Sequence, residues 1–185
     1  MRWRVSPLLR VGIAAALLIA AAALILGAGL PQRSDYTQIG LLGSLPIAPE
    51  INASAPPFDL ITRQGTIRFS DLLGKPLVIN FWATWCVPCE VELPELQAFQ
   101  DAHPDTAVIG VNVGEDPAIA EAWAAERGVT FPITFDQRGQ IAGLYAVRGM
   151  PTTFLVAPNG IILHIFFGAT TRAALENRLT LSLTQ

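Results

Sequence analysis

Residues 80–89 read Asn-Phe-Trp-Ala-Thr-Trp-Cys-Val-Pro-Cys, and this stretch decides the fold. It contains Cys86 and Cys89, which are the only two cysteines of the 185-residue chain. Two thiols separated by two residues can close a small disulfide ring and open it again. Since neither thiol has another partner in the chain, the spacing predicts a redox-active dithiol.

The residues on either side predict a strand and a helix around this dithiol. An uninterrupted apolar run from Leu77 to Ala83 is typical of a strand buried on both faces. A helix is expected from about Val87 to Ala102, which places Cys86 at its N-terminal end. Unpaired amides and the helix dipole stabilise a thiolate there. We therefore expect Cys86 to attack a substrate disulfide and Cys89, which is more covered, to resolve the mixed disulfide.

Strands and helices are expected to alternate in the rest of the C-terminal part. Residues 58–69 predict a hairpin, and Asn159-Gly160 between two apolar runs predicts another. Further strands are expected at 107–113, 131–135, 153–157 and 161–167, and further helices at 117–127, 141–146 and 171–183. This order predicts an α/β fold with helices on both faces of a central sheet.

The N-terminal part has a different composition. Residues 11–30 are twenty uncharged and mostly apolar residues, enough for a transmembrane helix. Arginines precede this run, which favours a cytoplasmic N-terminus at residues 1–10. We expect a transmembrane anchor at 11–30, a linker at 31–54, and a domain at 55–185 on the extracytoplasmic side of the cytoplasmic membrane. A cleavable signal peptide is the alternative, although its apolar core is usually only ~7–15 residues long.

Charge and ligand content exclude several classes of function. Fifteen acidic and eight basic residues follow Arg33, a balance of −7 that argues against binding to nucleic acid or to an anionic lipid surface. A zinc site would have to combine the cysteines with His103 and His164, whose spacing matches no common zinc pattern. We expect no metal and no cofactor beyond the Cys86–Cys89 disulfide.

Residues 80–89, followed by Glu92 and Pro94, resemble the thioredoxin superfamily and, within it, membrane-tethered thiol–disulfide oxidoreductases of the TlpA/ResA type. Residues 149–154, Gly-Met-Pro-Thr-Thr-Phe, resemble that family's second signature, in which the proline is cis and faces the cysteines. The resemblance runs from about Ala55 to the C-terminus. It implies a thioredoxin fold with a mixed central sheet and a strand-plus-helix insert at roughly residues 114–135.

The resemblance also implies roles for individual residues. Catalytic roles fall on Cys86, Cys89, Glu92 and Pro151, and substrate-positioning roles fall on Trp85, Pro88, Met150 and Thr152. Glu92 would accept the proton of Cys89, and burial would raise its pKa; an exposed carboxylate on the helix surface is the alternative. Two residues depart from related patterns. Asn80 replaces a buried Asp of thioredoxin, and Thr152 replaces a Glu of the cytochrome-maturation branch, which favours the broader TlpA/ResA group.

The function implied is reduction of disulfides in proteins that await cofactor insertion, such as apocytochrome c or copper-delivery proteins. A membrane thiol carrier would restore the dithiol. Three alternatives remain open at this point. The first is a disulfide-forming oxidase of opposite redox poise, and the second is a Cu(I) carrier that uses both thiolates and His164. The third is a peroxide-reducing relative, which would work from a cysteine outside a Cys-x-x-Cys pair.

Overall fold

The structure is a computed structural model that describes residues 47–62 and 65–183. The predicted anchor at 11–30 and most of the predicted linker lie outside these residues. Within the described ranges, no helix is both long enough and apolar enough to cross a membrane.

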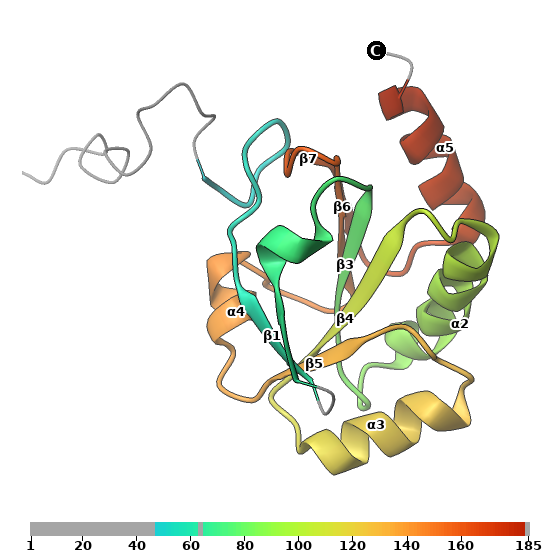
Figure 1. Cartoon of the computed structure of the whole chain (residues 1–185). Coiled ribbons are helices and arrows are strands. Elements are labelled where there is room, and N and C mark those ends of the chain that lie inside the picture. Colours follow the sequence, from blue (N-terminus) through green and yellow to red (C-terminus); the bar gives the residue numbers. More distant parts are fainter. Residues whose placement is uncertain (1–46, 63–64, 184–185) are drawn as a thin grey trace, which may run out of the picture. The chain divides into compact units, whose positions relative to one another are not determined.

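A five-stranded mixed sheet forms the centre of the domain (Figure 1). Its strands are β3 (Leu77–Trp82), β4 (Ala107–Val113), β5 (Ile133–Asp136), β6 (Thr152–Val156) and β7 (Ile162–Phe167). Their spatial order is β5-β4-β3-β6-β7, in which β3, β4 and β5 are parallel while β6 and β7 are antiparallel to their neighbours. Every residue of β3 is buried, which confirms the strand predicted from the apolar run before the cysteines.

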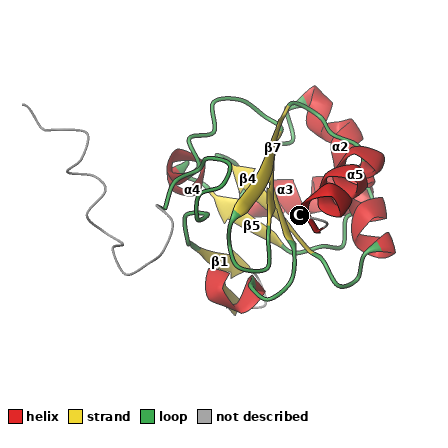
Figure 2. Cartoon of the chain, turned by 90° about the horizontal axis from the view of Figure 1, so that it is seen from above, coloured by secondary structure: helices red, strands yellow, loops and turns green. Residues whose placement is uncertain are grey.

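Helices cover both faces of this sheet, as predicted. The helices are α2 (Val87–Ala102), α3 (Pro117–Glu126), α4 (Gln140–Leu144) and α5 (Arg172–Leu183). In the view from above, α4 lies on one side of the sheet, and α2 and α5 lie on the other (Figure 2). The predicted hairpin is present as β1 (Asp59–Thr62) and β2 (Gly65–Arg68), a separate two-stranded sheet. The region of the predicted insert contains α3 and the edge strand β5.

Side chains of β3 alternate between two hydrophobic clusters, one on each face of the sheet. Leu77, Ile79 and Phe81 belong to the cluster that also contains residues of α4. Val78 and Trp82 belong to the cluster that contains the cysteines and α2. Since successive strand residues point to opposite faces, Asn80 is directed towards α2. The single polar residue of this strand is thereby placed beneath the active-site helix.

The linker boundary predicted at residues 54 and 55 is wrong, because residues 47–54 belong to the folded domain. The amide of Asn52 donates to the carbonyl of Ile162, and the amide of Ile162 donates to the carbonyl of Ala53, both at 2.9 Å. These bonds satisfy backbone groups at the outer edge of the sheet, which would otherwise remain unpaired. Ala53 is buried whereas Ile47 and Ile51 are about half exposed, so the segment lies on the surface of the domain and is held there by these hydrogen bonds.

Candidate active site

A disulfide between Cys86 and Cys89 lies where β3 leads into α2. Cys86 is the N-cap residue of α2, and the amide of Cys89 donates a hydrogen bond to Cys86 Sγ at 3.3 Å. In the reduced state, this amide and the helix dipole favour a thiolate on Cys86. Cys86 retains 4% exposure whereas Cys89 has none, so Cys86 is the sulfur that a substrate can reach. The geometry fits the roles predicted for both residues.

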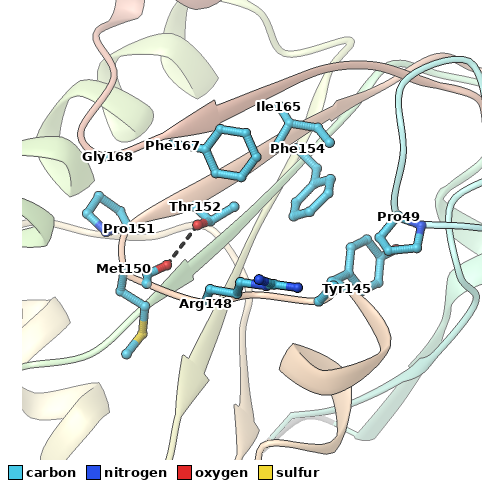
Figure 3. A pocket seen from close by; sticks show the side chains of 12 residues that line it. Pro49, Tyr145, Arg148, Met150, Pro151, Thr152, Phe154, Ile165, Phe167 and Gly168 are labelled. Carbon is cyan, nitrogen blue, oxygen red and sulfur yellow. Dashed lines mark hydrogen bonds between the residues drawn. The ribbon is translucent and has the colours of Figure 1, made fainter.

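The Met150–Pro151 peptide bond is cis, as the resemblance implied. Met150 packs against the hydrophobic cluster that contains both cysteines, so the chain's two signature stretches meet in space. The Thr152 hydroxyl donates to the carbonyl of Gly149 at 2.8 Å (Figure 3). The amide of Gly168 donates to the carbonyl of Pro151 at 2.9 Å. These two hydrogen bonds fix the backbone of the proline loop.

Glu92 is fully buried, one helical turn after Cys89. Its carboxylate accepts three hydrogen bonds, from Asn80 Nδ2 at 2.7 Å, Thr153 Oγ1 at 3.0 Å and the amide of Thr170 at 3.1 Å. Burial raises the pKa of Glu92 from 4.5 to about 7, and the three hydrogen bonds limit the rise because they stabilise the ionised form. The predicted rise in pKa is confirmed, and the alternative of an exposed surface carboxylate is excluded.

The partners of Glu92 were not predicted from the sequence. Asn80 also donates to Thr153 Oγ1 at 2.8 Å, so Asn80, Thr153 and Glu92 form a closed buried network. A signal was available, because a lone Asn inside an apolar strand requires a buried partner. Asn80 has no acidic proton and therefore cannot take the role of the Asp of thioredoxin. It instead donates a hydrogen bond to the carboxyl of Glu92.

A second carboxylate, Glu115, holds the loop that precedes the cysteines. Glu115 accepts a hydrogen bond from the amide of Thr84 at 2.7 Å and another from the Thr84 hydroxyl. Asn112 Nδ2 donates to the same carboxylate at 2.7 Å. Glu115 lies between β4 and α3, so this contact joins the predicted insert to the redox loop. Glu115 lies 31 residues after Thr84 in the sequence, so no local pattern predicted this contact.

The remaining predicted substrate-positioning residues surround the disulfide. Pro88 lies in the first turn of α2. Trp85 precedes Cys86 and is 67% exposed, while Val87 and Val91 are also exposed large apolar side chains. Apolar surface beside a reactive sulfur is suited to contact with another polypeptide.

Within residues 47–62 and 65–183, no three His, Cys, Asp or Glu side chains form a group that could hold a metal ion. His164 lies on β7, where its ring packs edge-to-face against Phe166 with centroids 4.5 Å apart. The ligand set of the copper-carrier hypothesis, which joins His164 to the cysteines, is not assembled in this structure.

Residues 51–165 match the model of the AhpC/TSA family. The chain belongs to this family. Among its relatives are thiol–disulfide oxidoreductases named ResA. The protein from Geobacillus kaustophilus is 38% identical over 132 residues, which cover 70% of this chain and 76% of the relative. ResA of Bacillus subtilis is 35% identical over 133 residues, covering 70% of this chain and 74% of that protein.

Solved structures agree with this assignment. A Chlorobium tepidum protein, provisionally assigned as the thiol:disulfide interchange protein DsbE, superposes with a TM-score of 0.68 at 32% identity, covering 72% of this chain and 98% of that one. StoA from Bacillus subtilis gives a TM-score of 0.59 at 30% identity, with 67% and 96% covered. The chain is thus a thiol–disulfide oxidoreductase with a thioredoxin-like fold.

Proposed function

We propose that this member of the AhpC/TSA family is a membrane-anchored, extracytoplasmic reductase of protein disulfides. The observation that carries the proposal is the buried carboxyl of Glu92 one turn after Cys89, with a pKa of about 7. A group with that pKa is partly ionised at neutral pH and can therefore accept a proton. The group that must lose a proton in this reaction is the Cys89 thiol, which lies three residues before Glu92 on the same helix.

The first step of the proposed reaction is attack by the Cys86 thiolate on one sulfur of a substrate disulfide. A bond forms between Cys86 Sγ and that sulfur, and the other substrate sulfur leaves as a thiolate. The helix N-terminus and the amide of Cys89 stabilise the attacking thiolate before the bond forms. Exposed Trp85 lies beside Cys86 and is placed to contact the substrate chain.

The second step releases the reduced substrate. The Cys89 thiol passes its proton to the Glu92 carboxylate, and its sulfur attacks Cys86 Sγ. The Cys86–Cys89 disulfide forms, and the second substrate sulfur leaves as a thiolate. Two electrons have then passed from the protein to the substrate, which restores the oxidised state seen in the structure. A membrane thiol carrier would return two electrons to the pair, and the proton held by Glu92 would return to Cys89, which regenerates the Cys86 thiolate and the Cys89 thiol.

Location and substrate class rest on the sequence. Residues 11–30 fit a transmembrane anchor, and the preceding arginines favour an extracytoplasmic domain. In such a compartment thiols become oxidised unless a reductant maintains them. The resemblance to the TlpA/ResA type supports substrates that need free cysteines for cofactor insertion, such as apocytochrome c or copper-delivery proteins.

Trapping of mixed disulfides tests this function. The Cys89→Ala variant should accumulate covalent complexes between Cys86 and substrate proteins, because the resolving sulfur is missing. The Cys86→Ala variant is the matched control and should trap nothing and reduce nothing. Complexes formed by Cys86→Ala but not by Cys89→Ala would reverse the assigned roles. Absence of complexes in both variants, with protein disulfides offered in excess, would refute the proposal.

A further inference from the structure

The pocket in Figure 3 has a volume of about 450 Å3. Its residues Tyr145, Phe154 and Ile165 belong to the hydrophobic cluster on the face of the sheet opposite the cysteines. Thr152 and Phe154 of β6 line the pocket, and their cross-strand neighbours Phe167 and Ile165 of β7 continue the same wall. Thr153, between the first two, points to the other face and bonds to Glu92. The pocket and the active site are therefore separated by the sheet but share the loop that contains the cis proline.

The pocket offers an apolar surface. Tyr145 lines it with its ring, because its hydroxyl already donates to the carbonyl of Pro56 at 2.8 Å. The Thr152 hydroxyl is likewise engaged by Gly149. Phe167 remains 83% exposed, the largest exposed fraction among the large apolar side chains of the described residues. A ligand with an apolar side chain would cover this surface and remove it from water.

One cation accompanies this apolar surface. The guanidinium of Arg148 extends from the loop before β6 towards Tyr145, across from Ile165 and Phe167 (Figure 3). In the part of the chain that the structure describes, no carboxylate pairs with Arg148, whereas Arg127 and Arg172 each bond to a glutamate. A planar cation beside an apolar wall is complementary to a carboxylate carried next to an apolar group.

We propose that this pocket selects the substrate by binding an apolar side chain followed by an acidic residue, in the segment next to the substrate cysteine. The proposal rests on the proposed function, because Met150 packs against the cluster that contains Cys86, and a polypeptide held by Cys86 would therefore run beside the loop formed by Met150, Pro151 and Thr152. That loop is one border of the pocket. The apolar side chain enters between Tyr145 and Phe167, and the carboxylate pairs with Arg148.

Competition between peptide disulfides tests the pocket. Three cyclic peptide disulfides of equal length would carry Leu-Glu, Leu-Lys or Ala-Glu after the second cysteine. Bis(2-hydroxyethyl) disulfide would serve as a small uncharged disulfide without side chains. The reduced full-length protein in detergent should reduce the Leu-Glu peptide with a kcat/KM roughly fivefold above that of either other peptide. Arg148→Glu should reverse the preference between Leu-Glu and Leu-Lys, and Phe167→Ser should abolish the preference for Leu over Ala.

Two matched variants control for unspecific effects. Arg138 is another exposed arginine without a carboxylate partner among the described residues, and it lines a different pocket. Ile119 is 61% exposed on α3. Arg138→Glu and Ile119→Ser should leave all peptide preferences unchanged. Reduction of bis(2-hydroxyethyl) disulfide, which has neither an apolar side chain nor a charge, should be equal in every variant.

The outcomes separate the pocket from the function. Equal kcat/KM for the three peptides in the wild type, with normal reduction of bis(2-hydroxyethyl) disulfide, would overturn the pocket proposal alone. An Arg148→Glu variant that keeps the wild-type preference would also overturn it. Failure to reduce any disulfide would refute the proposed function and, with it, the proposed subsite.

Discussion

Asn80 Nδ2 donates a hydrogen bond of 2.7 Å to Glu92 Oε2, joining the central strand to the active-site helix. The contact arises because Asn80 is the one polar residue on β3, and strand alternation directs it to the face covered by α2. A neutral amide stabilises the ionised carboxyl without competing for its proton. Asn80 therefore helps to keep the pKa of Glu92 near neutrality although the group is buried.

Glu92→Gln should slow the resolving step at pH 7 by at least about tenfold, because Cys89 loses its proton acceptor. The rate in the wild type should rise through about pH 7, and in the variant it should rise near the free thiol pKa of about 8.5. Stopped-flow decay of a mixed disulfide on Cys86 measures this step. Glu95→Gln, on the same helix, is the control. Identical profiles for wild type and Glu92→Gln between pH 5 and 9 would remove the proton-transfer role.

Thr153→Val should raise the pKa of Glu92 above its value of about 7, since a donor to the ionised carboxyl is lost. The pKa can be followed through the carboxyl carbon shift in a 13C NMR titration. Thr153→Ser restores a hydroxyl at the same place and should return the pKa towards the wild-type value. A lower pKa in Thr153→Val would contradict a stabilising hydrogen bond from Thr153 to the ionised carboxyl of Glu92.

Burial of Glu92 also predicts how stability depends on pH. The native pKa is about 7 and the unfolded one is 4.5, so the native state binds more protons between these values. Stability contributed by this group is complete below pH 4.5 and is lost as the pH rises to about 7. At about 1.4 kcal/mol per pKa unit, the loss reaches roughly 3 kcal/mol. Urea unfolding at pH 5 and pH 8 should show this difference between wild type and Glu92→Gln, and parallel stability curves would argue against it.

Glu115→Ala should loosen the loop before the cysteines, because the amide of Thr84 and the side chain of Asn112 lose their acceptor. The expected loss in the free energy of unfolding is about 1.5–3 kcal/mol, the usual contribution of a hydrogen bond to a charged group. Hydrogen exchange of the Thr84 amide should become faster. Asp105→Ala, an exposed carboxylate outside the site, is the control, and unchanged exchange at Thr84 in Glu115→Ala would show that the contact does not hold the loop.

The sequence was sufficient for the order of strands and helices, because their signals are local. The apolar run of β3, the Asn159-Gly160 turn and the proline at the start of α3 each predicted an element that the structure contains. Start positions were less certain. The strand predicted from Phe131 begins as β5 at Ile133, after Pro132, which lacks the amide that a strand ladder uses.

Contacts between residues far apart in the sequence could not be predicted from such local patterns. The sequence placed Glu92 beside Cys89, since both lie on one helix, but gave no partner for its carboxyl. Asn80 and Thr153 reach Glu92 because strand pairing and helix packing place them on one face of the sheet. The end of the linker was mistaken for the same reason. Residues 47–54 carry no strand pattern, and their bonds to β7 depend on the edge of a sheet formed by later residues.

The reduction potential of the Cys86–Cys89 pair tests the central claim most directly. The chain would be equilibrated in glutathione or dithiothreitol buffers of known potential, and the fraction of free thiols would be measured at pH 7. A reductase should have a potential near or below that of thioredoxin, about −270 mV. A potential close to −120 mV would mean that the dithiol form is favoured, which would contradict the proposed direction and make the protein a disulfide-forming oxidant.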